Sequence, residues 1–390
     1  MELNKRNILI LSVAQGLSIT STNINMISTG LVGTILSTNS ALATLPLSIQ
    51  FLTIALSLIP VSLLMGKFGR RPMFLFGAFS AFIGCLIIAF SIYDRSFLLF
   101  IIGSVLLGIS QANQQFYRYA AADNVSTNLK SKAISLVLAG GLIAAFIGPE
   151  ISKYSFDFFP DYIYLASYLL AALIQIINFV ILIFIKIDKP PPNKNLARPL
   201  SNILVQKNLV IAILAAAVGY SLMSFIMTAT PLQIVNVCKL GDVASATVIQ
   251  WHVIAMFAPS FFTGFVITKF GNKNVMLVGV LLYVISISFS IIGQTFLNFW
   301  ISLFLCGLGW NLLYVGGSDI IAKSASPEER PKVQGVTDFI IFTFVATGSF
   351  LAGALHTSLG WELMMIYTSV PIIILFVSIF VIKPHELSLR

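Results

Sequence analysis

The chain has very little charge for its length. Only 9% of its 390 residues are Asp, Glu, Lys or Arg, whereas a soluble domain carries about 25%. Apolar residues make up 57% of the chain, and the mean hydropathy is +0.95. A soluble protein of this composition would expose large apolar patches to water. The composition therefore excludes an ordinary soluble domain and indicates a protein with many membrane-spanning segments.

Cysteine is scarce as well. The three cysteines, Cys85, Cys238 and Cys306, lie far apart, and two of them fall inside apolar runs, so neither a disulfide framework nor a metal site is expected. The patterns Gly-x-x-x-x-Gly-Lys-Ser/Thr, His-Glu-x-x-His, Gly-x-Ser-x-Gly and Cys-x-x-Cys are absent. No polar segment is long enough to form a catalytic domain. The sequence therefore predicts a protein that is not an enzyme and that uses no cofactor or metal.

What the sequence has instead is a series of long apolar runs. A helix needs about 20 residues to cross a hydrocarbon core of about 30 Å. The predicted spans are 8–36, 41–65, 73–93, 97–121, 133–154, 162–185, 208–235, 243–267, 275–293, 298–322, 333–356 and 361–383. The basic residues Lys5 and Arg6 precede the first run, which we interpret as a retained helix because no convincing cleavage site follows.

The longest polar stretch, 186–207, divides these runs into six and six. It contains Pro190, Pro191 and Pro192 and is predicted to be an extended linker. We therefore predict an all-α polytopic membrane protein with two six-helix bundles, 1–185 and 208–390, related by pseudo-two-fold symmetry and joined by a cytoplasmic linker.

The basic residues predict the orientation of the chain. If both termini lie inside, all but three of the 23 Lys and Arg residues fall in inner loops and ends, the exceptions being Arg95, Lys153 and Lys239. Inner loops of membrane proteins carry such an excess. The net charge of +9 is therefore assigned to topology, and no nucleic-acid partner is expected.

One short loop occurs twice. Gly66-Lys67-Phe68-Gly69-Arg70-Arg71 joins the second and third runs, and Thr268-Lys269-Phe270-Gly271-Asn272-Lys273 joins the eighth and ninth. Two related helical halves are typical of many transporters.

On this loop, the six-plus-six spans and the linker, the chain resembles the major facilitator superfamily. The family pattern Gly-x-x-x-Asp-Arg-x-Gly-Arg-Arg is partly kept, with Ser62 at the first glycine and Gly66 at the acid. The missing acid puts in doubt the charge clamp that helps to close the inner face in the family. Among bacterial members there is a faint similarity to vitamin carriers of the riboflavin type. The resemblance implies a secondary transporter of the inner membrane that works by alternating access.

Several spans carry polar or aromatic side chains on one face. Polar groups inside a membrane are costly and usually face a cavity or a partner helix. In the first span they recur at steps of three and four residues, which places them on one helix face. The predicted substrate-binding residues are Gln15, Thr22, Asn25, Gln111, Gln115, Tyr220, Gln250, Trp251, His252, Trp310, Asn311 and Tyr314. The alternative for each is hydrogen bonding or packing between helices.

A second group of residues is predicted to act in coupling or gating. It consists of Arg118, Glu150, Asp319, Asp338 and the loop residues Lys67, Arg70 and Arg71. A guanidinium stays charged, so inside a membrane it needs an anion, a dipole or water. For Arg118 the alternatives are a structural pair with Asp319 or Asp338 and a side chain that reaches the interface. Glu150 and His252 are the candidate proton carriers.

These features favour a monomeric transporter of a small, neutral or amphiphilic, ring-containing solute, because the candidate site has few charges. Transport would be facilitative or coupled to protons. Two alternatives stay open, an efflux antiporter for drugs or metabolites and a non-transporting receptor or scaffold on the same fold.

Overall fold

The computed structural model of the chain describes residues 2–38, 42, 45–123, 125–126, 129–187, 200–326 and 329–381. Within these ranges the secondary structure is helical, with no strand. The helices are α1 (Glu2–Leu36), α2 (Leu45–Phe68), α3 (Arg70–Tyr93), α4 (Phe97–Gln114), α5 (Tyr117–Asp123), α6 (Lys130–Ala139), α7 (Gly141–Ser155), α8 (Leu165–Ile183), α9 (Leu200–Leu204), α10 (Lys207–Pro231), the π-helix η3 (Leu232–Val237), α11 (Asp242–Phe257), α12 (Ser260–Ile292), α13 (Phe296–Ser324) and α14 (Arg330–Val381).

These helices confirm the predicted all-α membrane fold with twelve long helical segments. Among the residues that the structure describes, ten helical stretches are long and apolar enough to cross a membrane. Three spans are interrupted, the fourth between α4 and α5, the fifth between α6 and α7, and the eighth between α11 and α12. Conversely, α14 contains the last two spans, joined at Gly360, and α12 contains the end of the eighth span and the ninth span, joined at Gly271; both glycines have non-helical backbone angles. Most of the predicted linker, 188–199, and the tail 382–390 lie outside the described residues.

The chain forms two compact units. Unit 1 comprises Met1–Asn124 and Gly140–Pro192, and unit 2 comprises Val125–Ala139 and Asn193–Arg390. Helix α6, the first half of the fifth span, therefore groups with unit 2, and α7 groups with unit 1. The bundle boundaries expected from the sequence, 1–185 and 208–390, remain predictions.

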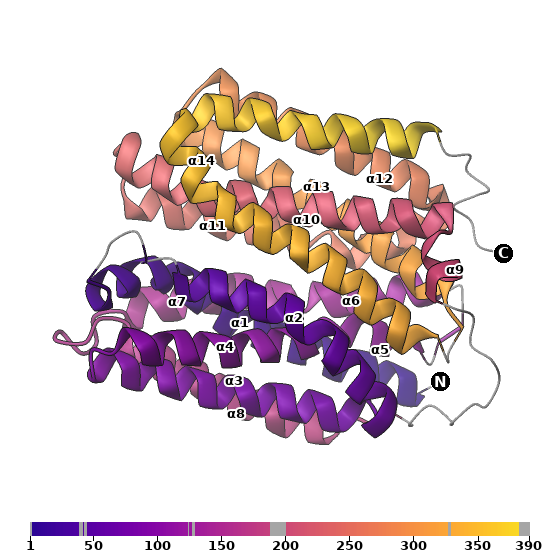
Figure 1. Cartoon of the computed structure of the whole chain (residues 1–390), viewed down its shortest axis with the longest axis horizontal. Coiled ribbons are helices and arrows are strands. Elements are labelled where there is room, and N and C mark those ends of the chain that lie inside the picture. The colour runs from indigo at the N-terminus through magenta and orange to yellow at the C-terminus, as the bar shows by residue number, and fades with distance from the viewer. Residues whose placement is uncertain are drawn as a thin grey trace. The chain divides into compact units, whose positions relative to one another are not determined.

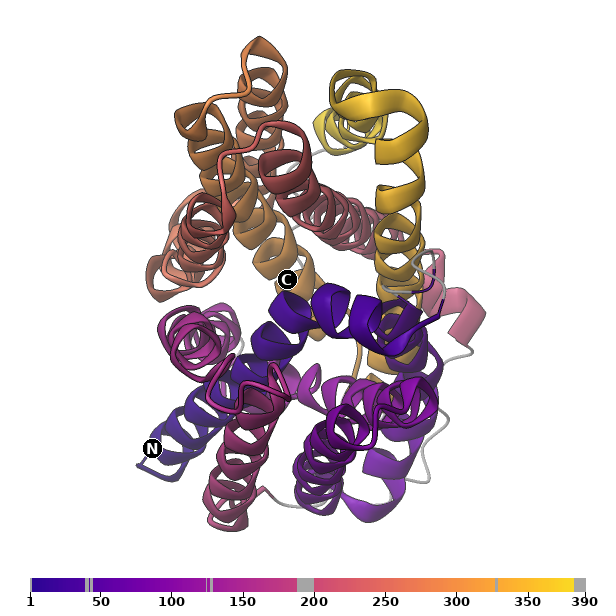
Figure 2. The same cartoon turned by 90° about the vertical axis from the view of Figure 1, so that its left-hand side faces the viewer.

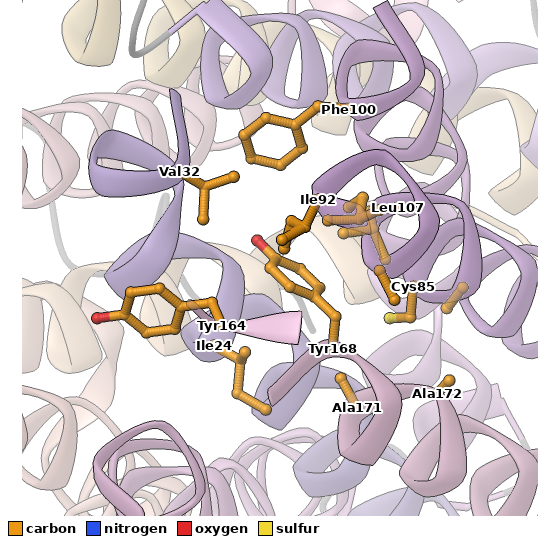
Figure 3. Close-up of a cluster of buried hydrophobic side chains, with 13 residues drawn as sticks. Ile24, Val32, Cys85, Ile92, Phe100, Leu107, Tyr164, Tyr168, Ala171 and Ala172 are labelled. Atoms are coloured by element: carbon orange, nitrogen blue, oxygen red, sulfur yellow. The ribbon is translucent and has the colours of Figure 1, made fainter. Parts of the chain in front are cut away.

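In unit 1, α3 packs between α4 and α8, while α1 packs against α7 and α8 (Figure 1). Buried side chains from α1, α3, α4 and α8 form a hydrophobic cluster (Figure 3). The ring of Tyr168 on α8 lies inside this cluster, edge-on to Phe100 with 6.4 Å between ring centroids. The cluster fixes α8 against α3 and α4, and it also fixes the direction of the Tyr168 hydroxyl.

In unit 2, α13 packs against α10, α11 and α12, and α10 also packs along α14. Figure 2 shows the helices of each unit nearly end-on. Helix α6 packs against α12 and α13. Helix α10 ends at Pro231, which has no N–H for a helical hydrogen bond, and the chain continues as the π-helix η3. The helix type therefore changes from α to π at this proline.

The repeated loop has the same backbone form in both units. Gly69 and Gly271 have φ values of 92° and 79°, a region that side-chain-bearing residues rarely adopt. Two residues later, Arg71 donates to the carbonyl of Ile183 at 2.8 Å, and Lys273 donates to the carbonyl of Phe380 at 2.8 Å. Each basic side chain thus caps the C-terminal end of the last spanning helix of its own unit, where the helix dipole favours a cation.

The first copy of the repeated loop forms an ion pair with an acidic residue elsewhere in unit 1. Arg70 forms an ion pair with Asp123 at the end of α5, with 2.7 Å between Nη2 and Oδ2. Arg70 is buried, so this pair is shielded from water on one side. The family pattern places its acid inside the loop, whereas here the acid that pairs with the loop arginine comes from the fourth span.

We expect Gly140 to tolerate no side chain. A Cβ at this position would lie 1.8 Å from the backbone oxygen of Ser12 on α1, and helix backbones cannot move apart cheaply. Gly140→Ala is therefore expected to lower the free energy of unfolding by about 3 kcal/mol or more. Thermal unfolding of the purified protein measures this effect. Gly219→Ala is the matched control, because its Cβ would meet only the Leu313 side chain, at 3.0 Å. Equal stability of the two variants would contradict the prediction.

Candidate functional site

Unit 1 contains a continuous chain of hydrogen-bonded amides on three helices. Asn25 on α1 donates to Gln50 on α2 at 2.5 Å, and Gln50 donates to Gln111 on α4 at 2.8 Å. Gln111 in turn donates to the hydroxyl of Thr22, back on α1. We call Asn25, Gln50, Gln111 and Thr22 the amide chain. Three of these residues were predicted from the sequence, and the structure brings them together.

The buried end of the amide chain, at Asn25, is hydrogen-bonded to α8. The hydroxyl of Tyr168 donates to Asn25 Oδ1 at 2.5 Å, and Thr29 Oγ1 lies 3.0 Å from the same oxygen. Asn25 is fully buried, while Gln111 and Thr22 are partly exposed. The amide chain therefore has a buried end, bonded to Tyr168, and a partly exposed end at Gln111.

The sequence analysis missed Gln50 and Tyr168. Gln50 is a polar amide inside the second apolar run, and it is only 1% exposed. The argument that a polar group in a membrane helix needs a partner applies to it as it does to Asn25. No comparable signal exists for Tyr168, because a tyrosine in a span packs as readily as it hydrogen-bonds.

The remaining predicted residues of unit 1 outside the repeated loop lie on α1, at the junction of α4 and α5, and on α7. Gln15 on α1 is buried, and its Oε1 has no hydrogen-bond partner within the part of the chain that the structure describes. Arg118 is 2% exposed and donates to Gln115 Oε1 and to the Tyr119 hydroxyl, both at 2.9 Å. Its guanidinium also lies 4.4 Å from the centroid of the Tyr119 ring. Glu150, by contrast, is exposed on α7.

Unit 2 contains an aromatic cluster formed by Tyr220, Phe257, Trp310, Tyr314 and Phe342. Trp310 and Tyr314, one turn apart on α13, stack with 5.0 Å between ring centroids and 19° between ring planes. Tyr220 on α10 lies edge-on to both of them, at 5.3 and 5.2 Å, and to Phe342 at 5.2 Å. Phe257 on α11 contacts Trp310 at 5.6 Å. The three predicted aromatic residues Tyr220, Trp310 and Tyr314 therefore meet in one place.

Polar atoms of the aromatic cluster and its helices are left without protein partners. The indole N–H of Trp310 has no acceptor among the described residues, although the side chain is only 2% exposed. On α10, one and two turns after Tyr220, the hydroxyls of Ser224 and Thr228 are likewise unpartnered within the described ranges. Such donors need a water or a ligand in a membrane protein, so this part of α10 and α13 can accept a polar ring compound.

The side-chain amide of Asn311, next to Trp310, forms hydrogen bonds with other residues of the protein. Its amide nitrogen donates to the carbonyl of Met256 and to Ser260 Oγ, and its oxygen accepts from Thr263. These groups flank the break between α11 and α12. Asn311 therefore stabilises the bend of the eighth span, which agrees with the alternative of hydrogen bonding between helices.

The three adjacent residues predicted on the eighth span point in different directions. His252 is fully buried and donates from Nδ1 to the carbonyl of Leu303 at 2.6 Å. That bond leaves Nε2 as a bare acceptor, and no described residue donates to it. Trp251 is 41% exposed and packs against Trp300 and Phe304, away from the aromatic cluster. Gln250 is partly exposed.

Among the residues assigned to coupling or gating, Asp319 lies in a buried network of hydrogen bonds. It is fully buried on α13 and accepts from Ser131 on α6 at 2.5 Å, from Asn272 at 2.9 Å and from Lys323 at 2.6 Å. Asp338 on α14 is also fully buried, whereas Lys67 is exposed in the loop. Asp319 thus joins the first half of the fifth span to the tenth span and to the second copy of the repeated loop.

Comparison with known proteins identifies the family of this fold. The model of the Major Facilitator Superfamily matches residues 11–249 and 239–389, nearly the whole chain. The chain belongs to the major facilitator superfamily. The resemblance noted from the repeated loop is therefore confirmed. So is the prediction that the chain is a transporter and not an enzyme.

This transporter has similar relatives in sequence and in structure. It is 38% identical over 362 residues to the riboflavin transporter RfnT of Brucella anthropi, covering 92% of this chain and 91% of that protein. The crystal structure of the human organic anion transporter MFSD10 matches with a TM-score of 0.76 at 13% identity, covering 96% of this chain and 99% of that one. FucP in the outward conformation matches with a TM-score of 0.73 at 12% identity, covering 96% and 97%. The two crystal structures support the fold alone.

The transporter also has a polar cluster at one end of unit 2. His356, between the last two spans, donates from Nε2 to Gln233 Oε1 at 2.8 Å, and Gln233 donates to Gln294 Oε1 at 2.7 Å. Cys238 donates to the same oxygen at 3.3 Å. Burial lowers the pKa of His356 below its usual value of 6.5, so the imidazole is neutral at pH 7. This cluster ties η3 to the turns between the ninth and tenth and between the eleventh and twelfth spans.

Proposed function

We propose that the transporter carries a planar, ring-containing organic solute of the riboflavin type across the bacterial inner membrane. The observation that carries the proposal is the 38% identity to RfnT, which extends over 91% of that protein. Two features of the structure support it. The amide chain of unit 1 supplies neutral donors and acceptors, and the aromatic cluster of unit 2 supplies flat apolar surfaces with an unpartnered indole N–H.

The proposal includes the mechanism and the topology expected from the sequence. The bundles 1–185 and 208–390 move relative to each other, so that the solute site opens alternately to either side. Both termini lie in the cytoplasm, and the protein acts as a monomer. Transport is facilitative or coupled to protons.

Uptake of riboflavin into proteoliposomes tests the proposed function, because the flavin is fluorescent and its accumulation can be followed directly. We expect vesicles with the purified protein to take up riboflavin faster than empty vesicles, and unlabelled flavin to compete. If flux rises with an imposed inward proton gradient, transport is proton-coupled, and if it does not, transport is facilitative. No protein-dependent flux in either direction would overturn the proposal and favour the scaffold alternative.

A further inference from the structure

The accessible end of the amide chain has unused hydrogen-bonding capacity. A primary carboxamide has two N–H donors and two acceptor lone pairs. In Gln111 the observed bonds use one N–H, given to Thr22, and one lone pair, which accepts from Gln50. Exchanging the oxygen and nitrogen of every side-chain amide in the amide chain would reverse the direction of each hydrogen bond. Gln111 would still use one donor and one acceptor. Within the described ranges, one donor and one acceptor of Gln111 therefore remain, on a side chain that is partly exposed.

The position of Gln111 on α4 shows which helices surround it. Another face of α4 packs tightly on α3, where Gly103 faces the backbone of Gly84 and Ser80 donates to the carbonyl of Leu106. Gln111 instead lies toward α1 and α2, as its bonds to Thr22 and Gln50 show. An amide with a free donor and acceptor is costly against lipid. This face must therefore meet water or a polar solute.

The other residues of the amide chain also hold the Gln111 amide in place. Asn25 and Gln50 are 0% and 1% exposed, and Tyr168, whose ring packs inside the hydrophobic cluster of Figure 3, donates to Asn25. Because each amide is bonded at both ends, the Gln111 amide cannot rotate without breaking bonds in a dry environment. A site that holds its polar groups in this way is preorganised for one hydrogen-bonding pattern.

We propose that Gln111 is a specificity-determining residue that binds the imide edge of the solute ring, an N–H donor beside a C=O acceptor. This inference rests on the proposed function, because it concerns the same solute. A carboxamide and an imide edge form two parallel hydrogen bonds, as amides do with base edges in nucleic acids. A flavin ring carries this edge at N3–H, between its two carbonyl groups. A methyl group on N3 removes the donor and fills the space of the bond.

Binding of riboflavin and 3-methylriboflavin to the full-length purified protein tests the inference. We expect the wild-type protein to bind riboflavin at least about tenfold more tightly, since an amide left without its partner loses about 1.4 kcal/mol or more. Gln111→Leu should weaken riboflavin binding by about the same factor and bind both flavins equally. Gln206→Leu is the matched control, because Gln206 lies outside the spans and the site.

Each outcome has a distinct meaning. Equal binding of both flavins by the wild-type protein, or discrimination that survives in Gln111→Leu, overturns the inference and leaves riboflavin transport standing. If Gln111→Leu does not fold, Gln111→Met replaces it, since a thioether has no N–H donor and is only a weak acceptor, so this variant should also bind riboflavin weakly and the two flavins equally. If the wild-type protein binds neither flavin, the proposed function fails. The imide inference is then tested with uridine and 3-methyluridine, and absence of discrimination there overturns it as well.

Discussion

Replacing Asp319 with leucine is expected to lower the free energy of unfolding by about 3 kcal/mol or more. The carboxylate is fully buried and is the acceptor for Ser131, Asn272 and Lys323. Removing one partner of a buried ion pair typically costs about 3–5 kcal/mol, because the other charge is left without compensation. The Lys323 side chain is 20% exposed, so water recovers part of this loss and the lower end of the range applies.

A double-mutant cycle separates this cause from simple loss of packing. Asp319→Leu with Lys323→Met removes both charges, and replacing a buried pair by apolar residues is often close to neutral. The double variant is therefore expected to be more stable than Asp319→Leu alone, as measured by thermal unfolding. Asp157→Leu, at an exposed acidic position, serves as the control. If the double variant is no more stable than the single one, the uncompensated charge of Lys323 is not the source of the loss.

Replacing Arg118 with alanine is expected to reduce transport by about 100-fold. The guanidinium donates hydrogen bonds to Gln115 and to Tyr119 and lies over the Tyr119 ring. A hydrogen bond from a charged group contributes about 1.5–3 kcal/mol, and each 1.4 kcal/mol changes an equilibrium tenfold. Since α5 contains both Arg118 and the Asp123 that pairs with Arg70, the change also reaches the first copy of the repeated loop.

The flux of riboflavin into proteoliposomes, corrected for the amount of folded protein, measures the effect. Arg118→Lys keeps the charge but has no planar fork to bind Gln115 and Tyr119 together, so an intermediate flux is expected. Lys207→Ala, which removes an exposed charge at the start of α10, should leave the flux unchanged. Normal flux in Arg118→Ala would show that Arg118 takes part in neither solute binding nor gating.

The features that local sequence determines were predictable for this transporter. Apolar runs longer than about 20 residues must cross a membrane as helices, so the spans and the all-α class follow from composition and length. The steps of three and four residues place Asn25 and Thr22 on one face of α1, because helical periodicity is a local property. The repeated loop predicted the family, and its two glycines have matching backbone angles.

The partners of those side chains are decided by packing between distant segments, which no local pattern contains. Helical periodicity shows that Asn25 needs a hydrogen-bond partner, but only the approach of α2 and α8 supplies Gln50 and Tyr168. Trp251 and Trp310 both lie inside predicted spans, yet one packs away from the aromatic cluster and the other forms its centre.

The difference between local pattern and packing of distant segments also applies to the ion pairs of Asp123 and Asp319 and to the hydrogen bonds of Asn311. The sequence by itself determined that this chain is a helical membrane transporter with two related sets of spans. The tertiary structure alone decided that Arg70 pairs with Asp123, that Asp319 bonds to α6, and that Asn311 is used by the bend of the eighth span. The physical reason is that a helix face is set within about four residues, whereas a hydrogen bond between helices depends on which backbones approach closely enough.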